Sequence, residues 1–333
     1  MKRVVFENNL IGDRDEAMRL CREEEGAVDI VSHIRPLDTL KVAESTYAKV
    51  VKSRDLTCLN GVFNQRKRGS KWKDIRLRKA LNYAINREEL WRYAAKGNAF
   101  NLGGHIPPEA FGHNPHIEPY GYDTERARAL LQEAGYANGF EMTIITHEAW
   151  KLENQIVSKM LERVGLRVKT DVLTWPGLMK KFYVPILDKP PEEQEWDLSL
   201  FYLADWYAHT GATFLAFYLI DESNMRWTEY DPTYEEMWKE MASAFDLETQ
   251  EEKIRLMEQY LYDQAYLLLV YSPLTLYAVN KEVNFIPQKF EMMRLKETSV
   301  TDNHCSIREE PPHSEAGMNL AWDEIWPLPE GVE

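Results

Sequence analysis

The stretch from Lys73 to Leu90, KDIRLRKALNYAINREEL, constrains the fold more than any other part of this chain. Apolar residues recur in it at every third or fourth position, which is the spacing of one face of an α-helix. Asn86 stands three residues before Glu89, as an N-cap stands before the third residue of its helix. The segment therefore predicts two helices that meet at Asn86. The apolar residues of the first helix are Leu77, Ala80, Leu81, Ala84 and Ile85.

The following region predicts alternating helices and strands. Asp123 is suited to cap a helix, and Gly135 can adopt the left-handed conformation that ends it. An alternating strand comes next, then an amphipathic helix that stops at Gly165, then a second strand. This order is a βαβ unit, so the fold is predicted to be α/β. The alternating residues of the first strand are Phe140, Met142 and Ile144.

Composition sets the outer limits. With 333 residues the chain is long enough for two domains or lobes. Its formal net charge of −14 disfavours nucleic acid or an anionic membrane surface as a partner. No apolar run approaches the roughly 20 residues that span a bilayer. The cysteines are scattered and odd in number, which predicts buried free thiols and no disulfide framework. They are Cys21, Cys58 and Cys305.

Signatures of catalysis are missing from the sequence. It contains no G-x-S-x-G, no H-E-x-x-H, no phosphate-binding loop and no G-x-G-x-x-G. The histidines His105, His113 and His116 lie in a loop rich in glycine and proline, and their spacing fits no standard zinc pattern. We therefore expect no enzyme activity, no metal and no cofactor.

Two segments together resemble a known family. An extended run ends in Phe63-Asn64, and the helical segment that follows carries a spaced set of charged and apolar residues. This combination resembles a signature of solute-binding protein family 5, the dipeptide- and oligopeptide-binding components of ABC transporters. The region from Tyr120 to Thr146 resembles the next block of that family. The matching residues of the helical segment are Asp74, Arg76, Arg78, Ala80, Leu81, Ala84, Ile85, Asn86, Arg87 and Leu90.

The resemblance implies an α/β, type II periplasmic-binding-protein-like fold with one complete lobe plus part of a second. Residues 1–62 and 272–333 would form the partial first lobe, and residues 63–271 the second, ligand-binding lobe. Asn64 would lie at the hinge between them. The segment from Gly26 to Ile30 resembles a stretch that lies well into longer relatives, so the chain is expected to be truncated at its N-terminus.

The resemblance also implies a ligand site after the strand that begins at Asp197. Relatives place an aromatic-x-Ala-Asp-aromatic turn there, and its aspartate pairs with the α-ammonium of a bound peptide. Tyr202, Asp205 and Trp206 match that pattern, and Tyr207 and His209 are their neighbours. A carboxylate held in a cleft attracts an ammonium more strongly than one in water. The link that follows is longer than in relatives and lacks proline. Asp205 as a solvated turn residue or a helix cap is the alternative.

Trp175 matches a position at which relatives often place an aromatic side chain in the ligand cleft. Thr174 is suited to cap a helix there, and Pro176 to its first turn, so Trp175 would lie at the start of the helix. A tryptophan gives a large apolar contact with little loss of entropy, which suits a site that accepts many ligands. With 10 tryptophans in the chain, an ordinary core position is the equal alternative.

The function implied by the resemblance is that of a substrate-binding component, or a fragment of one, of an ABC importer. It would bind peptides in a cleft between two lobes, close by hinge rotation, and deliver them to permease subunits from a periplasmic or extracellular, membrane-associated position. An oligosaccharide ligand and a cytoplasmic ligand-sensing module are the alternatives, because aromatic residues can stack on sugars and no export signal is evident. An uncovered sheet edge in the partial lobe predicts a homodimer.

Overall fold

The computed structural model describes residues 14–22, 27–54, 56–184, 188–204, 226–288 and 295–307. The chain forms two compact units. Unit 1 comprises Met1–Lys52, Thr275–Pro287 and Arg294–Glu333, and unit 2 comprises Ser53–Leu274 and Gln288–Met293. The first boundary lies earlier in the chain than the predicted one after residue 62, and the second lies slightly later than the predicted one after residue 271. The assignment of two domains as lobes of a ligand cleft stays a prediction.

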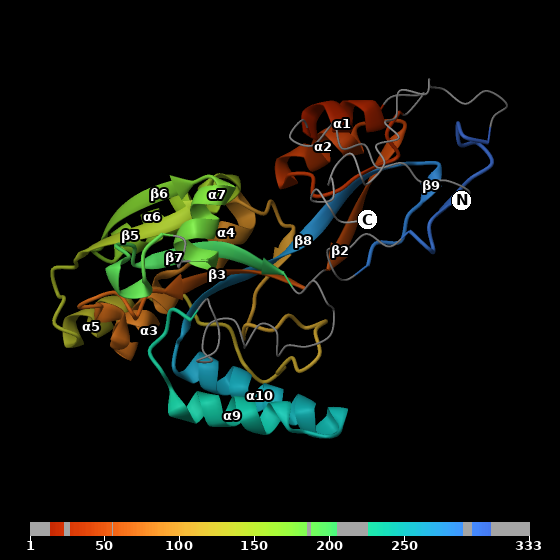
Figure 1. Cartoon of the computed structure of the whole chain (residues 1–333). Helices are drawn as coiled ribbons and strands as arrows, with labels where there is room; N and C mark the ends of the chain where they lie inside the picture. Colours follow the sequence, from red (N-terminus) through yellow and green to blue (C-terminus); the bar gives the residue numbers. More distant parts are fainter. Residues whose placement is uncertain are drawn as a thin grey trace, which may run out of the picture. The chain divides into compact units, whose positions relative to one another are not determined.

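The sheet of unit 2 is mixed. Its strands lie in the order β8, β3, β7, β5, β6 (Figure 1). Strand β5 pairs in parallel with both β6 and β7, whereas β3 is antiparallel to β7 and to β8. The predicted βαβ unit is confirmed, because helix α6 connects β5 to β6. The strands are β3 (Thr57–Phe63), β5 (Glu141–His147), β6 (Arg167–Leu173), β7 (Leu198–Ala204) and β8 (Leu267–Asn280), and the short β4 (Ala99–Phe100) pairs with β8.

Both faces of this sheet are covered. Every residue of β3 is buried, as expected of a strand between two layers. Leu59 and Phe63 face a core shared with α3, α5 and α6, and Cys58 and Val62 face a second core shared with α9 and α10. Helices α9 and α10 lie side by side (Figure 1). The helices of unit 2 are α3 (Ile75–Ala84), α4 (Arg87–Tyr93), α5 (Thr124–Glu133), α6 (Lys151–Arg163), α7 (Trp175–Leu178), α9 (Pro232–Ala242) and α10 (Leu247–Asp263).

Most predicted helix ends are confirmed. Asn86 Oδ1 accepts a hydrogen bond of 3.2 Å from the backbone N–H of Glu89, so it caps α4. Asp123 caps α5 in the same way, through the N–H of Arg126. Gly135 has a φ of 89°, the predicted left-handed conformation. Thr249 and Glu252 have the spacing of a capping box, which predicts a helix that begins directly after Thr249. This prediction is wrong, because Asp246 is the N-cap of α10 and the helix begins one turn earlier, at Leu247.

Unit 1 combines helices with the second half of β8. Strand β1 (Ile30–Val31) pairs antiparallel with β8 at Val279 and Ala278. Strand β2 (Ala48–Arg54) also pairs with β8, and β9 (Val283–Asn284) pairs with β10 (Ser299–Val300). Its helices are α1 (Arg14–Cys21) and α2 (Thr39–Ala43). Cys21 and Cys58 are buried thiols as predicted, whereas Cys305 is partly exposed.

Side chains of α3 and α4 complete the outer edge of β8 in unit 2. Asn82 Nδ2 donates to the carbonyl of Leu267 at 2.9 Å, and its Oδ1 accepts from the N–H of Leu269 at 3.1 Å. Arg87 Nη2 donates to the carbonyl of Leu269 at 2.5 Å, and its Nη1 donates to that of Tyr120 at 2.9 Å. Asn82 and Arg87 therefore do for this edge what a neighbouring strand would do.

Arg78 connects α3 to the C-terminal end of α10 through hydrogen bonds. It donates to the carbonyls of Trp72 at 2.6 Å and Gln264 at 2.7 Å, and to that of Ala265 at 3.1 Å. Burial lowers the pKa of both Arg78 and Arg87 to about 10, which still leaves each guanidinium protonated at neutral pH. A planar cation with five donors can satisfy several carbonyls at once, and this explains why arginine stands at these positions.

Replacing Arg87 by methionine should lower the free energy of unfolding by more than about 3 kcal/mol, because the carbonyls of Leu269 and Tyr120 lose their donor while staying buried. Urea unfolding of the purified chain measures this. The matched control is Arg92→Met, an exposed arginine on the same helix, which should change stability by no more than about 0.5 kcal/mol. A loss below 1 kcal/mol for Arg87→Met would show that the edge of β8 does not depend on this side chain.

A buried carboxyl group holds the glycine-rich loop that follows β4. Glu258 of α10 accepts from the N–H groups of Ile106 at 2.7 Å and Asn114 at 2.8 Å. A Cβ on Gly104 would lie 2.0 Å from Oε1 of Glu258, so only glycine fits there. Burial raises the pKa of Glu258 from 4.5 to about 8, against the lowering effect of these backbone donors.

Stability should therefore fall as the pH rises between about 4.5 and 8, because folded Glu258 keeps a proton over this range that the unfolded chain releases. Thermal unfolding at a series of pH values measures the slope. Glu258→Gln should remove this contribution and lower stability at every pH, since its amide group places donors against backbone N–H groups. The control Glu252→Gln, on an exposed position of α10, should keep the wild-type slope. An unchanged slope in Glu258→Gln would contradict the assignment.

Candidate ligand-binding edge

Three parallel strands of unit 2 end at one edge of the sheet. Strands β5 and β6 are in register at their last residues, His147 and Leu173. Strand β7 runs parallel to β5 on its other side and ends at Ala204. The segments that leave β5 and β6 lie next to each other, since the rings of His147 and Trp175 are 5.8 Å apart. In open α/β sheets ligands bind at the carboxyl ends of the strands.

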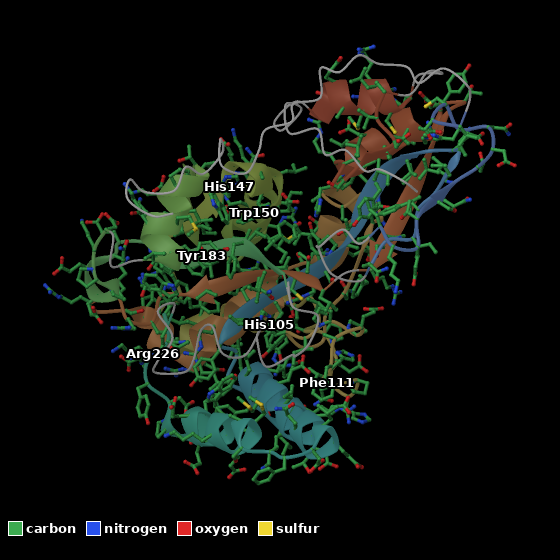
Figure 2. The ribbon with its side chains drawn as sticks, turned by 45° about the vertical axis from the view of Figure 1, so that its right-hand side comes forward. His105, Phe111, His147, Trp150, Tyr183 and Arg226 are labelled. Atoms are coloured by element: carbon green, nitrogen blue, oxygen red, sulfur yellow. The ribbon has the colours of Figure 1, made fainter. Side chains whose placement is uncertain are left out.

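A continuous row of aromatic rings occupies this edge. The ring of Trp175 lies 5.8 Å from that of His147, and the ring of His147 lies 5.4 Å from that of Trp150. Trp150 in turn lies 5.5 Å from Tyr202, and Tyr183 lies 5.5 Å from Trp175. Figure 2 labels His147, Trp150 and Tyr183. We call these five residues the aromatic row. Their edge-to-face and tilted contacts hold the rings in fixed orientations.

The structure places Trp175 at the surface. Its side chain is 47% exposed, so the alternative that it is an ordinary core residue is wrong. Helix α7 begins at Trp175 with Pro176 in its first turn, as predicted. Thr174 has the extended conformation of an N-cap (φ −70°, ψ 163°), but within the described residues its side chain makes no capping hydrogen bond. The part of Trp175 that faces solvent is free to contact a ligand.

Tyr202 lies at the other end of the row and joins it to a carboxyl group. Its hydroxyl is 2.8 Å from that of Tyr271 on β8, and both hydroxyls donate to Oε1 of Glu153 at 3.3 Å. Burial raises the pKa of Glu153, and the two phenols lower it by a smaller amount. Glu153 belongs to the first turn of α6, directly after Trp150 and the end of β5.

The remaining predicted ligand residues, Asp205, Trp206, Tyr207 and His209, lie outside the described residues. Their ligand-binding roles stay predictions. In the sequence, Asp205 directly follows Ala204, the last residue of β7.

Asn64 is buried inside unit 2, at the end of β3. Its Oδ1 accepts from the N–H of Lys67 at 3.0 Å, and its carbonyl accepts from Ser70 Oγ at 2.7 Å. These bonds shape the turn that leads toward α3. The hinge role of Asn64 stays a prediction. The chain passes between the two units at other positions, after Lys52, Leu274, Pro287 and Met293.

Sequence reasoning missed four members of this edge: His147, Trp150, Glu153 and Tyr271. His147 and Trp150 directly follow a predicted strand, and the rule that ligands bind at strand ends would have pointed to them. Glu153 and Tyr271 could not be found in this way, because a tertiary contact between α6 and β8 brings them together.

A metal site and a membrane span are the other possibilities for the described residues. No group of three or more His, Cys, Asp or Glu side chains there could hold a metal ion. His105 is buried, and His113 Nδ1 lies 2.8 Å from the carbonyl of Ile106. None of the described helices is both long and apolar enough to cross a membrane.

A surface groove of about 740 Å³ runs between α4 and α6. Its charged side chains pair with one another, as in the contact of Arg163 with Glu89 at 2.8 Å and that of Arg92 with Glu88 at 3.0 Å. These pairs leave no unmatched charge of one sign to attract a ligand.

Trp175→Ala should lower the free energy of unfolding by less than about 1 kcal/mol, because about half of the side chain is already in water. Trp227 provides the matched control: it is fully buried and stacks on Phe182 with a ring separation of 5.9 Å. Trp227→Ala should lower the free energy by about 3–5 kcal/mol. Equal losses in urea unfolding would show that Trp175 supports the fold and is not a surface residue kept for binding.

Known proteins match this chain in sequence. Residues 2–224 match the family described as bacterial extracellular solute-binding proteins, family 5 Middle. The chain is 26% identical over 174 residues to heme-binding protein A of Haemophilus influenzae, a match of 50% of this chain and 31% of that protein. It is 24% identical over 175 residues to the dipeptide-binding protein of Escherichia coli, a match of 50% of this chain and 32% of that protein.

Solved structures show the same fold. The periplasmic binding protein DppA of Helicobacter pylori, in complex with the peptide STSA, superimposes with a TM-score of 0.72 at 20% identity, over 82% of this chain and 51% of that one. The ABC transporter substrate-binding protein CtaP of Listeria monocytogenes gives a TM-score of 0.75 at 17% identity, over 87% and 59%. The chain thus spans only part of each relative. These likenesses confirm the α/β, type II periplasmic-binding-protein fold, and with the matched family they show that the chain belongs to the bacterial extracellular solute-binding proteins of family 5.

Proposed function

We propose that this chain is the substrate-binding component of an ABC importer, or a part of it, and that it binds peptides at the carboxyl edge of β5, β6 and β7. The observation that carries the proposal is the aromatic row along this edge, which ends at Tyr202, three residues before Asp205. Relatives named for binding a dipeptide, or solved with a peptide, support the ligand class.

The chemistry of the edge suits a peptide. A site that binds peptides of varied sequence needs one fixed charge for the peptide terminus. The rest of its surface must accept side chains of different shapes. Asp205 would supply the anchor by pairing with the α-ammonium of the ligand. The flat faces of Trp175 and Trp150 would supply apolar contact without demanding one side-chain shape.

The rest of the proposal follows from the family. The chain would deliver its ligand to permease subunits from a periplasmic or extracellular position, and would carry out no reaction itself. The truncation, the closure of two lobes and the homodimer through the partial lobe also stay predictions. In unit 1, Leu37 and Leu40 are 57% and 71% exposed, which supports an association surface on that unit.

An oligosaccharide is the second candidate ligand, and the same aromatic row favours it, because rings of this kind can stack on sugars. The two ligand classes differ in charge. A peptide brings an ammonium group to Asp205, whereas a neutral sugar does not, so blocking the ammonium distinguishes them.

A peptide ligand at about 100 times its dissociation constant should raise the free energy of unfolding by roughly 2.7 kcal/mol, and N-acetylation of that peptide should abolish the gain. Thermal unfolding with a library of free and acetylated peptides measures both. Asp205→Asn should cost roughly 2–5 kcal/mol of binding free energy, because the ammonium then lacks its counter-charge. Equal stabilisation by free and acetylated peptides, or by an oligosaccharide alone, would contradict the peptide proposal.

A further inference from the structure

Glu153 lies within the candidate edge but has no counter-charge there. Its side chain is only partly exposed, and Oε1 is bonded by the hydroxyls of Tyr202 and Tyr271. No lysine, arginine or histidine of the described residues forms an ion pair with it. A half-buried carboxyl group without a cationic partner costs folding free energy, since phenols replace its hydration only in part.

The two phenols hold this carboxyl group in one place. Tyr202 projects from β7 and Tyr271 from β8, with β3 between the two strands, and the register places both opposite Leu59 on the same face of the sheet. Their hydroxyls are 2.8 Å apart, so one hydroxyl can donate to the other while the second donates to Glu153. A group fixed by two rigid strands is suited to specific recognition.

Aromatic rings lie close to the same carboxyl group. Trp150 precedes α6, in whose first turn Glu153 stands, and its ring lies 5.5 Å from that of Tyr202, the residue that donates to Glu153. A cation that approaches Glu153 would meet these electron-rich rings at the same time. The combination of a carboxylate with aromatic faces is the chemistry that binds an ammonium or guanidinium group.

We propose that Glu153 is a specificity-determining residue that selects peptides with a positively charged side chain. Its carboxylate receives the lysine or arginine head group while Trp150 and Tyr202 contact the aliphatic stem. Tyr271 is a positioning residue, because it touches Glu153 and not the ligand. This inference rests on the proposed function: Asp205 anchors the α-ammonium, and Glu153 reads a second positive charge.

A pair of tripeptides tests the inference. Ala-Lys-Ala and Ala-norleucine-Ala share a four-carbon central side chain, and only the lysine carries a terminal ammonium group. Isothermal titration calorimetry with the full chain should give an affinity at least 10-fold higher for the lysyl peptide. In Glu153→Gln this ratio should fall to within about 2-fold. The matched control Glu148→Gln removes an exposed acid close by in the chain and should keep the wild-type ratio.

Tyr271→Phe separates positioning from folding. It should reduce the lysyl preference at least 3-fold while leaving the affinity for the norleucyl peptide within 2-fold of wild type, which a general loss of structure would not do. The wild-type ratio and Tyr271→Phe remain decisive if Glu153→Gln fails to fold. Binding of both tripeptides with equal affinity, or a preference that survives in Glu153→Gln, overturns the role of Glu153 and leaves the proposed function standing. A chain that binds no peptide at all overturns both.

Discussion

The edge of β8 in unit 2 depends on hydrogen bonds from side chains instead of from a neighbouring strand. Asn82 and Arg87 satisfy the backbone groups of Leu267 and Leu269, and Arg78 does the same for the carbonyls just after α10. Buried backbone groups without partners would destabilise the strand by about 1–3 kcal/mol each. The arginines thus close the sheet on one side and attach the helical layer to it.

The hydrogen bonds that satisfy the edge of β8 also help to position β5, β6 and β7, on the other side of the sheet. Strands β8 and β3 are fixed between two cores, β7 pairs with β3, and β5 pairs with β7. The carboxyl ends of β5, β6 and β7 therefore form one rim of the sheet, which is the candidate ligand-binding edge. The aromatic row and Glu153 stand on this rim. The helix motif and the candidate ligand edge are therefore linked through the sheet, although no residue of the motif belongs to the row.

Local patterns in the sequence predicted much of this structure. The caps at Asn86 and Asp123, the left-handed Gly135 and the βαβ unit each depend on a few neighbouring residues, and they are confirmed. The start of α10 was misplaced because two overlapping capping signals, Asp246 and Thr249, compete, and the earlier one gains a turn of helix.

Features that depend on residues distant in the chain were not predictable in this way. The motif arginines could be recognised as a family pattern. Their carbonyl partners could not, because Ala265 lies 187 positions from Arg78 and Leu269 of β8 lies 182 positions from Arg87. The Glu153 cluster joins three elements that no periodicity relates. Trp175 was predictable in part. Thr174 and Pro176 predicted that a helix starts there, but no local pattern predicted that the side chain is exposed.

The central claim is that ligand binds at the rim formed by β5, β6 and β7. Hydrogen–deuterium exchange with and without a stabilising peptide tests it most directly. The account predicts that ligand slows exchange of the backbone amides in the chain segments His147 to Trp150 and Thr174 to Tyr183. Exchange in α4 should be unchanged. Protection confined to α4, on the groove between α4 and α6, would contradict it.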